Sequence, residues 1–322
     1  MRAIVFDRFG DESVLHIGEV PSPPLVEGAL RIRVRATAVN RADLLQREGH
    51  YPPPPGASPI LGLECAGEIA EIAKGVGGWH VGDRAMALLP GGGYAEEAVA
   101  DAGSVMRIPD ALSFEEGGAI PEVFLTVFLT IFDLARAARG ETLLVHGGGS
   151  GVGTAAITLG KLAGLRVLVT VGSDEKGQLC CKHGADEAIN YKTEDFAELA
   201  RGANMILDHI GAPYLQRDLQ ALDFDGRVVL IGSMGGGGKV EVDVGSLIHK
   251  RQQIIGSTLR ARSKEAKARV VAGFIKRFGD DLSSGRIRPV IHRVYPLEQA
   301  AEAHREMAGD HFGKIVLRVA QT

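Results

Sequence analysis

Hydrophobic and polar positions alternate along much of the first 110 residues. In the stretch "LRIRVRATAV", residues 30–39, apolar side chains at every second position alternate with arginines and a threonine. A period of two is typical of a strand that has one face on a core and the other in water. Similar short runs are separated by glycine and proline turns such as "PPPPGAS" and "PGGG". This part of the chain is predicted to form an antiparallel, barrel-like β domain.

The pattern changes after residue 110. Ser113 and Glu116 have the spacing of a helix capping box, and the apolar run 123–138 predicts a mostly buried helix that ends at Gly140. Six near-continuous apolar runs then alternate with segments that suit helices, at residues 142–146, 166–171, 187–190, 205–210, 227–232 and 253–259. Buried parallel strands have this character, so the sequence predicts an α/β fold with a doubly wound, six-stranded parallel sheet.

The last 60 or so residues return to a mixed pattern of two helical segments and two short strands, "PVIHRVYP" and "GKIVLRV". We expect this tail to complete the first domain, since a chain that inserts one domain into another usually returns to the first. The predicted division is therefore a β domain formed by residues 1–118 and 263–322, and a sheet domain formed by residues 119–262.

The segment "LLVHGGGSGVGTAAITLGKLAG" has the order strand, glycine loop, helix. Gly148, Gly151 and Gly153 would permit a tight turn, close approach of backbone N–H groups to a pyrophosphate, and close packing of helix on sheet. The spacing departs from G-x-G-x-x-G, so tight packing alone stays open as an alternative. The position of the loop after the first strand of a parallel sheet favours dinucleotide binding.

The end of the next strand bears on the choice of dinucleotide. Gly172 and Ser173 stand where an NAD-specific site has an acid for the ribose 2′-hydroxyl. A carboxylate about 4 Å from a 2′-phosphate would cost on the order of 4 kcal/mol at an effective dielectric constant of 20. The small residues, with Lys176 nearby, therefore favour NADPH over NADH, although Lys176 could also be a solvated lysine on a helix face.

Composition narrows the possible partners. Lys and Arg number 36 against 40 Asp and Glu, a net charge of -4, which provides no electrostatic footprint for nucleic acid. No apolar run approaches the roughly 18 residues of a membrane helix, and no signal peptide is visible, so we expect a cytoplasmic protein with no membrane partner. Three cysteines, two of them adjacent, cannot form a disulfide framework or a four-thiolate zinc lobe.

The stretch "GLECAGE" places Glu64 beside Cys65, which could be a metal site, a nucleophile with its base, or no chemical site at all. No histidine lies nearby in sequence to activate the thiol, and His146 reads as a core or strand-end histidine. Cys65 is therefore expected to be a small buried residue. Glu64 is expected to have a structural role, paired with an arginine such as Arg41 or Arg47.

Several longer motifs carry a family resemblance over nearly the whole chain: "NRADLLQREGHYPPPPGASPILGLE", "MALLPGGG", "SGVGTAAI" and "FGKIVL". They resemble the zinc-independent quinone oxidoreductases of the medium-chain dehydrogenase/reductase superfamily. The resemblance implies a GroES-like catalytic domain, a Rossmann domain with NADPH in the cleft between them, and a homodimer. Zinc-containing members have a cysteine where this chain has Asn40 and a histidine where it has Leu63, so no zinc site is expected.

The missing ligands affect the expected reaction. Alcohol oxidation needs a Lewis acid, whereas a quinone or an activated alkene is already electrophilic and can accept hydride without a metal. We therefore expect an NADPH-dependent, zinc-independent reductase whose substrate is a small-molecule quinone. An enal or enone reductase, and an NADPH-binding sensor or structural protein with little turnover, stay open as alternatives. The homodimer is expected to form by edge pairing near "QIIGSTL".

The resemblance also implies roles for individual residues. Asn40 corresponds to an asparagine beside the nicotinamide, Tyr51 to a substrate-pocket tyrosine, and Ser150 to a contact in the cofactor pocket; these three are the candidate catalytic residues. An asparagine ending a strand and a packed rim aromatic are the structural alternatives for Asn40 and Tyr51. Thr126 corresponds to a nicotinamide-side contact, with a back-bonded helical threonine as the alternative.

Tyr191 matches a family tyrosine near the 2′-phosphate, where it would join Ser173 and Lys176 in selecting NADPH. Residues 231–238 and 256–262 resemble loops whose backbone lies along the nicotinamide. The predicted cofactor contacts are Asn40, Thr126, Gly148, Ser150, Gly151, Val152, Gly153, Gly172, Ser173, Lys176, Tyr191, Ile210, Gly232, Ser233, Met234, Ser257 and Leu259.

Overall fold

The computed structural model describes residues 1–320 and divides into two compact units. Unit 1 contains Met1–Leu125 and the C-terminal part from Arg260, and unit 2 is Thr126–Leu259. The last two residues of the predicted C-terminal segment lie outside the described residues. The tail does return to the first unit, because its strands join the same sheet as the strands of the N-terminal part.

Unit 1 is built on a seven-stranded sheet in the order β14-β15-β3-β4-β5-β7, with β6 paired to β3, beside a two-stranded β1-β2 sheet. Apart from the parallel pair β14-β15, neighbouring strands of the main sheet are antiparallel. The strands are β1 (Arg2–Val5), β2 (His16–Glu19), β3 (Ala29–Val39), β4 (Glu64–Ile72), β5 (Arg84–Leu88), β6 (Glu97–Asp101), β7 (Val105–Arg107), β14 (Ile291–Pro296) and β15 (Lys314–Arg318).

Strand β3 confirms the alternation predicted from the sequence. Its apolar positions, including Leu30, Ile32 and Val34, are fully buried, while Arg31 and Arg33 reach toward solvent. The apolar face joins the main core of unit 1 together with residues from β4, β5 and β15. Burial of one face of an antiparallel sheet therefore sets the register in which these strands pair.

Helices of unit 1 interrupt and flank this sheet. The β-dominated prediction missed α1, which begins directly after β3 and buries Leu44. The capping box predicted at Ser113 is present at the start of α2. The helical elements are η1 (Glu12–Val14), α1 (Arg41–Arg47), η2 (Ala102–Ser104), α2 (Phe114–Gly117), α3 (Pro121–Val127), α9 (Lys264–Ser283), η4 (Leu297–Gln299) and α10 (Ala300–Ala308).

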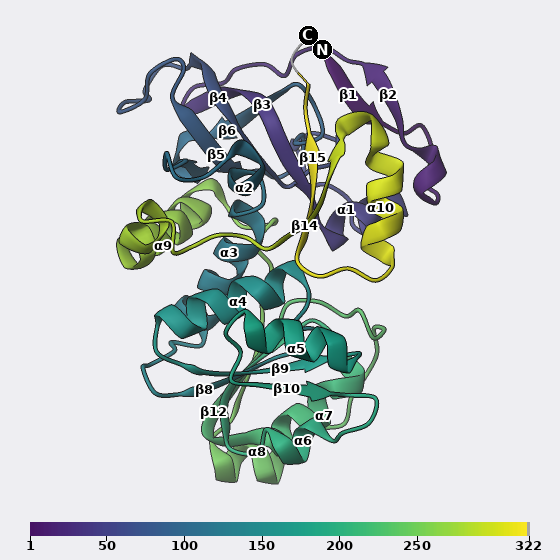
Figure 1. The fold of residues 1–322 in the computed structure, drawn as a ribbon, viewed down its shortest axis with the longest axis vertical. Helices are drawn as coiled ribbons and strands as arrows, with labels where there is room; N and C mark the ends of the chain where they lie inside the picture. The colour runs from purple at the N-terminus through teal and green to yellow at the C-terminus, as the bar shows by residue number, and fades with distance from the viewer. Residues whose placement is uncertain (321–322) are drawn as a thin grey trace. The chain divides into compact units, whose positions relative to one another are not determined.

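Unit 2 is a parallel sheet of six strands in the order β10-β9-β8-β11-β12-β13, as predicted. Figure 1 shows α4 and α5 on one face of this sheet and α6, α7 and α8 on the other. The strands are β8 (Thr142–Val145), β9 (Arg166–Val171), β10 (Glu187–Asn190), β11 (Ala203–Asp208), β12 (Leu222–Leu230) and β13 (Gln253–Gly256). The helices are α4 (Gly151–Leu162), α5 (Asp174–Lys182), α6 (Phe196–Leu199), α7 (Ala212–Ala221) and α8 (Val244–Lys250).

The helix predicted over residues 123–138 differs in its second half. It is α-helical only to Val127 and continues as a π-helix, η3 (Phe128–Leu134). The Thr130 hydroxyl donates to the carbonyl oxygens of Thr126 and Val127, at 2.8 and 3.2 Å. A hydroxyl that back-bonds in this way occupies carbonyl oxygens of the helix and accompanies a local change in winding.

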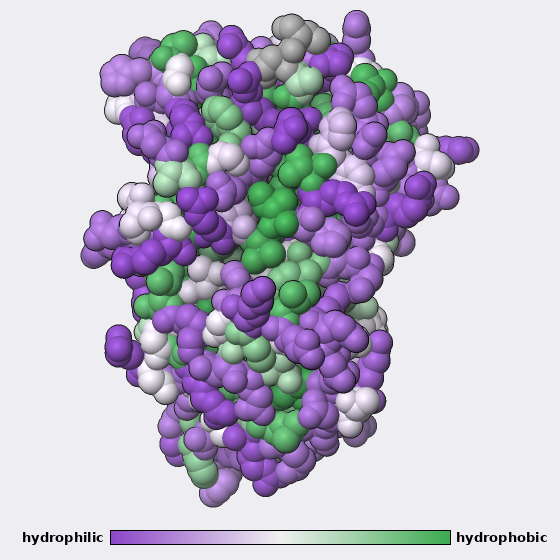
Figure 2. Space-filling view, viewed as in Figure 1, coloured by the Kyte–Doolittle hydropathy of each residue, from purple (hydrophilic) through white to green (hydrophobic). Residues whose placement is uncertain are grey.

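The surface seen in Figure 2 is mainly hydrophilic, with apolar side chains in small groups. Among residues 1–320, no helix has both the length and the apolar character required to cross a membrane.

Candidate active site

The glycine loop of unit 2 connects β8 to α4. Gly147 has a φ of 66°, a conformation that favours glycine. Ser150 is the N-cap of α4, and its hydroxyl oxygen accepts a hydrogen bond from the Gly153 N–H at 3.0 Å. A Cβ placed on Gly153 would lie 2.4 Å from the Gly147 carbonyl oxygen, so this turn requires glycine. The result is a glycine loop directly before a helix N-terminus, an arrangement suited to an anionic phosphate group.

Most of the predicted cofactor residues follow the carboxyl ends of the parallel strands. The glycine loop follows β8, the segment 172–176 follows β9, and Tyr191 follows β10. Ile210 follows β11, residues 232–234 follow β12, and Ser257 and Leu259 follow β13. Parallel strands bring these ends to one edge of the sheet, the edge at which ligands bind in doubly wound folds.

Residues predicted to select the 2′-phosphate follow the neighbouring strands β9 and β10. These strands are neighbours, with Val171 opposite Asn190. Ser173 caps α5 by accepting from the Lys176 N–H at 3.3 Å. A Cβ on Gly172 would lie 2.9 Å from the Tyr191 hydroxyl oxygen, which shows that the tyrosine leans over this glycine.

The loops after β11, β12 and β13 form the other half of the edge. A Cβ on Gly211 would lie 3.1 Å from the Gly232 carbonyl oxygen, so the first two loops touch. The Ser257 hydroxyl oxygen is buried and has no hydrogen-bond partner among residues 1–320. An orphaned hydroxyl beside a glycine-lined edge fits a polar ligand such as a dinucleotide. Thr126 lies on α3, and Asn40 and Tyr51 belong to unit 1, so their predicted cofactor contacts stay predictions.

Unit 1 contains a buried ion pair that joins β15 to β4. The Lys314 ammonium lies 2.8 Å from Glu64 Oε1, and these side chains are 2% and 0% exposed. Lys314 also donates to Asn40 Oδ1 at 2.6 Å and to the Val39 carbonyl oxygen at 3.2 Å. Asn40 Nδ2 donates to Glu64 Oε1 at 2.9 Å. Three elements are thus tied together by one charged cluster, which we call the Glu64–Lys314 cluster: Asn40, Glu64 and Lys314.

The expected partner of Glu64 is corrected by this arrangement. Arg41 is exposed, and Arg47 instead contacts Glu48, His304 and the Gly10 carbonyl oxygen. Lysine is the partner because β15 pairs with β3 and places position 314 against Asn40 and Glu64. The contact could not be predicted because the two residues are 250 positions apart in the chain. The only local signal was a lysine at the start of an apolar strand.

The donor set around Glu64 does not fit a zinc ion. Asn40 and Glu64 both engage the Lys314 ammonium, and Leu63 offers no ligand atom. Zinc sites in proteins use three or four nitrogen, sulfur or oxygen ligands. Cys65 is fully buried, and burial raises its thiol pKa well above the usual range, so it is not a nucleophile at neutral pH.

Polar contacts continue from Asn40 into the core. The Asp43 carboxylate accepts from the Asn40 N–H at 2.8 Å, the Gly62 N–H at 3.0 Å and the Tyr94 hydroxyl at 3.3 Å. Burial raises the pKa of Asp43 to about 6, although the hydrogen bonds from the Asn40 and Gly62 N–H groups lower it. The Tyr94 hydroxyl also lies 3.1 Å from His304 Nε2, and burial lowers the pKa of His304 to about 3. Asp43 was not predicted as part of the site.

Tyr51 lies on a loop held by Arg260. The Arg260 guanidinium is 5.2 Å from the centre of the Tyr51 ring and donates to Gln46 Oε1 at 2.6 Å and to the Pro90 carbonyl oxygen at 2.8 Å. Arg260 is only 4% exposed. It therefore fixes the rim around Tyr51.

Glu122 is a further acid near the Glu64–Lys314 cluster, and it was not predicted as a site residue from the sequence. It lies in the first turn of α3, where its backbone N–H donates to Glu64 Oε2 at 2.9 Å. The residue as a whole is partly exposed. Burial of its carboxyl, and then the charge of Glu64, raise the pKa of Glu122 to about 8. The sequence signal was an acid directly after Pro121 at the start of an apolar helix.

A second buried polar cluster lies in unit 2, formed by His146, Asp208 and Asp218. His146 Nε2 lies 2.8 Å from Asp218 Oδ1, and His146 Nδ1 lies 3.1 Å from the Thr170 hydroxyl. Burial raises the pKa of Asp218 to about 8 and that of Asp208 to about 6, and lowers that of His146 to about 4. Among residues 1–320 these are the only three side chains grouped closely enough to hold a metal ion. His146 is a core residue, as expected.

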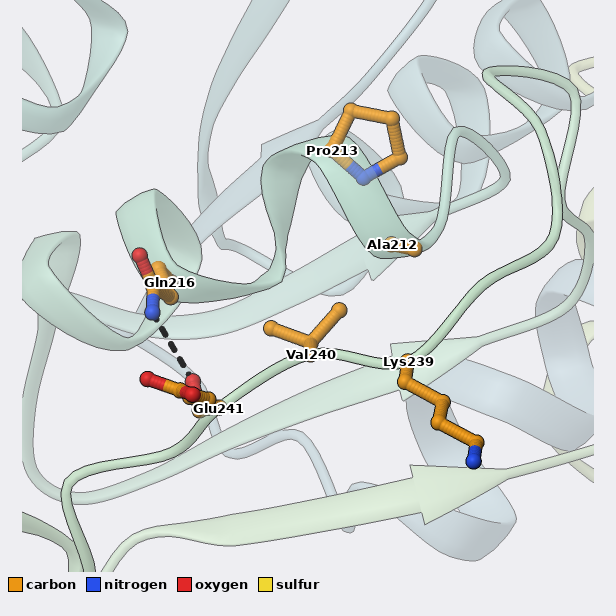
Figure 3. Close-up of a pocket in the computed structure, with 6 residues that line it drawn as sticks. All are labelled: Ala212, Pro213, Gln216, Lys239, Val240 and Glu241. Carbon is orange, nitrogen blue, oxygen red and sulfur yellow. Dashed lines mark hydrogen bonds between the residues drawn. The ribbon is translucent and has the colours of Figure 1, made fainter.

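Two hollows open on the surfaces of the units. One, of about 440 Å³, lies between the start of α7 and residues 239–241, and none of the predicted cofactor residues lines it. Figure 3 shows its one internal hydrogen bond, from Gln216 to the Glu241 backbone, with the Lys239 side chain pointing away. The other, of about 290 Å³, is a mostly apolar hollow in unit 1 beside the proline loop that follows Tyr51.

Comparison with known proteins agrees with this fold. Residues 26–110 match the family described as the alcohol dehydrogenase GroES-like domain, and residues 151–274 match that described as zinc-binding dehydrogenase. The chain is 32% identical to the quinone oxidoreductase of Rattus norvegicus, an alignment that covers 98% of this chain and 97% of that protein.

Two solved structures are similar over the whole chain. The quinone oxidoreductase of Pseudomonas syringae pv. Tomato DC3000 has a TM-score of 0.86 at 27% identity, covering 98% of this chain and 99% of that one. The quinone oxidoreductase of Escherichia coli complexed with NADPH has a TM-score of 0.85 at 26% identity, covering 99% of this chain and 100% of that one. Together these findings show that the chain is an oxidoreductase and belongs to the quinone oxidoreductase family of the medium-chain dehydrogenase/reductase superfamily.

Proposed function

We propose that the chain is an NADPH-dependent, zinc-independent reductase of small-molecule quinones. The observation that supports this most directly is the Lys314 ammonium, which engages both Asn40 and Glu64 where a metal would need ligands. Without a Lewis acid, the favoured acceptors are those that are already electrophilic. Bound NADPH supplies the hydride, and the chain binds, orients and shields the reactants.

The same electrophile argument covers enals and enones, so both acceptor classes belong in the test. Purified protein, dialysed against a chelator, is assayed with NADPH and a panel of ortho-quinones, para-quinones and enones. We expect turnover of quinones with no loss after dialysis. Tight NADPH binding without turnover of any acceptor would contradict the enzyme function proposed and favour a sensor or structural role. Turnover of enones alone would favour the alkene reductase.

Selectivity for NADPH is proposed from Ser173, Lys176 and Tyr191, which follow the carboxyl ends of the neighbouring strands β9 and β10. A lysine near the 2′-phosphate adds a favourable charge interaction that NADH lacks. We predict that Lys176→Ala weakens NADPH binding about tenfold, roughly 1.4 kcal/mol, and leaves NADH binding unchanged. Cofactor fluorescence titration measures both affinities.

Lys182→Ala is the matched control, because Lys182 is exposed in the last turn of the same helix. It should change neither affinity by more than about twofold. Equal loss of NADPH and NADH affinity in Lys176→Ala would show that the lysine does not read the 2′-phosphate.

Assembly and location complete the proposal. Strand β13 is the last strand of the six-stranded sheet, and Ile254 on it is 38% exposed. An edge strand presents unpaired backbone groups that a second copy can use, which supports pairing as a homodimer. Cytoplasmic location stays a prediction.

A further inference from the structure

The charge balance around Glu122 differs from that around Glu64. Lys314 directs its ammonium hydrogens to Glu64, Asn40 and the Val39 carbonyl oxygen. Glu64 receives further hydrogen bonds from Asn40 Nδ2 and the Glu122 N–H. The Glu122 carboxyl has no hydrogen-bond or ion-pair partner among residues 1–320. The available positive charge thus stabilises Glu64 as a carboxylate and leaves Glu122 beside it without a cation.

Other elements of unit 1 also act on Glu122. Lys314 and Arg260 lower its pKa, whereas Glu64 and Asp43 raise it. Burial raises the pKa of Tyr51 and lowers that of Lys267, a largely buried residue of α9, and an ionised Glu122 would shift both pKa values upward. Burial and the neighbouring carboxylate outweigh the cations, so the acid form dominates at neutral pH.

Glu122 is more exposed to solvent than the residues of the Glu64–Lys314 cluster. Asn40, Glu64 and Lys314 are 8%, 0% and 2% exposed, whereas Glu122 and Tyr51 are partly exposed. Glu122 is therefore the acid next to the Glu64–Lys314 cluster that a ligand or a water molecule can reach. Its backbone N–H bond to Glu64 anchors the first turn of α3 and holds the side chain at the border of this cluster.

We propose that Glu122 is the proton donor for the reduced acceptor, an inference that rests on the proposed function. The quinone accepts a hydride from the dihydronicotinamide, a two-electron reduction, and becomes a hydroquinone monoanion while the nicotinamide is oxidised. The O–H bond of the Glu122 carboxyl then breaks and an O–H bond of the hydroquinone forms. The resulting carboxylate takes a proton from water, which restores the starting state.

The energetics favour this direction of transfer. A phenol such as tyrosine titrates near 10, so a phenolate is a stronger base than a carboxylate whose acid has a pKa of about 8. An acid with a pKa close to the working pH is both protonated in the resting state and able to release its proton. A positioned general acid typically contributes on the order of 10²–10⁴-fold to a rate.

The test compares wild-type protein with Glu122→Gln, Glu122→Asp and a control, Glu265→Gln. Glu265 is an exposed glutamate in the first turn of α9, whose pKa is lowered by its backbone hydrogen bond. Quinone kcat with NADPH is measured from pH 6 to 10, together with the solvent deuterium isotope effect. We expect the wild-type rate to fall about tenfold per pH unit above pH 8 or so, and Glu122→Gln to lose on the order of 100-fold with no such fall.

Glu122→Asp should keep the fall in rate above its own pKa at reduced kcat, and Glu265→Gln should match wild type. A second readout needs no turnover. In protein labelled with ¹³C-glutamate and free of cofactor, isotope-edited infrared spectroscopy should show one protonated glutamate carboxyl near neutral pH. That band should titrate with a midpoint near 8 and be absent from Glu122→Gln, while thermal unfolding confirms that the variant is folded.

The outcomes distinguish the two proposals. If wild type reduces quinones and Glu122→Gln keeps both its kcat and its pH profile, the role of Glu122 is wrong and the proposed function stands. A Glu122 carboxyl already ionised at pH 6 would likewise overturn the role. If NADPH-bound wild type reduces no quinone, the proposed function fails, and the role of Glu122 in it fails as well.

Discussion

Each of the two units buries a polar cluster. The cluster in unit 1 contains an acid paired with a lysine, whereas the cluster in unit 2 contains two acids beside a histidine. In unit 1, Glu64 is paired with the Lys314 ammonium at 2.8 Å. In unit 2, Asp208 and Asp218 lie beside His146, and burial raises the pKa values of both acids and lowers that of the histidine. A neighbouring cation favours the charged form of a buried acid, whereas burial without a cation raises the pKa of the acid.

The difference shows how each cluster depends on its surroundings. The Glu64–Lys314 cluster relies on a cation brought by the far end of the chain, and losing either partner leaves a buried charge. The cluster in unit 2 contains groups with pKa values of about 4, 6 and 8, so its proton count changes with pH. The first should therefore be sensitive to substitution, and the second to pH.

The largest effect is expected for Lys314→Met. This change leaves the Glu64 carboxylate buried without its cation, which typically costs about 3–5 kcal/mol of unfolding free energy. Chemical denaturation at pH 7 measures the loss. A loss below about 1 kcal/mol would contradict the role assigned to the pair.

The double variant Glu64→Gln with Lys314→Met is the control for this prediction. Glutamine keeps an oxygen to accept from Asn40 and from the Glu122 N–H but removes the charge. Replacing both partners of a buried pair by neutral residues is often close to neutral. Most of the stability lost in Lys314→Met should therefore return.

A smaller effect is expected for Asp218→Asn, and it depends on pH. The pKa of Asp218 is about 8 in the folded protein, against roughly 3.9 in an unfolded chain. Between these values the folded state holds a proton that the unfolded chain has released, so the free energy of unfolding falls as pH rises. The slope is at most about 1.4 kcal/mol per pH unit. Asp218→Asn removes this slope, so the stability of the variant relative to wild type should rise by about 2.6 kcal/mol from pH 5 to 7.

Denaturation at several pH values tests this slope. Asp225→Asn is the matched control, because Asp225 is an exposed residue of the same unit that pairs with Arg251. It should keep the wild-type slope between pH 5 and 7. Parallel curves for wild type and Asp218→Asn would mean that Asp218 is ionised throughout.

The smallest effect is expected for His146→Gln at acid pH. The pKa of His146 is about 4 when folded, against roughly 6.5 unfolded, so its stabilising effect is complete above 6.5. As pH falls below 6.5 the unfolded chain takes up a proton that the folded protein refuses. Wild type should lose about 1–2 kcal/mol between pH 6.5 and 5 through this group, and His146→Gln should lose less.

His249→Gln, at an exposed position of unit 2, provides the comparison for that measurement. It should follow the wild-type curve through the same pH range. If His146→Gln also follows it, another group accounts for the acid sensitivity.

Much of the fold could be predicted because it depends on local patterns. The alternation in β3 and the six apolar runs of unit 2 each report burial of a strand over a few neighbouring residues. The β pattern failed at α1, where seven residues are too few for a helical period to stand out. The helix prediction was also wrong in part within residues 123–138. Hydrophobicity does not distinguish an α-helix from the π-helix in which the Thr130 hydroxyl donates to the Thr126 carbonyl oxygen.

The candidate site was predictable only in part. The tight turn predicted before the helix is present, and a Cβ would clash at Gly148 and Gly153, because such a turn restricts residue type locally. Their contact with a cofactor stays a prediction. Asp43 and Glu122 were missed because a charged residue in an apolar run does not reveal which partners surround it. The arginine expected beside Glu64 was wrong for the same reason, since Lys314 is 250 positions away in the chain.

The sequence by itself determined most strands and several helices, the parallel sheet with its glycine loop, and the absence of zinc ligands at positions 40 and 63. Local hydrophobic periodicity and backbone restrictions carry that information. Only the tertiary structure decided which acids are charged. Strand pairing between β15 and β3 brings the Lys314 ammonium to Glu64 and leaves Glu122 without a cation. The protonation state of a buried acid depends on its burial and on charges within a few ångströms, and only the folded chain brings those charges together.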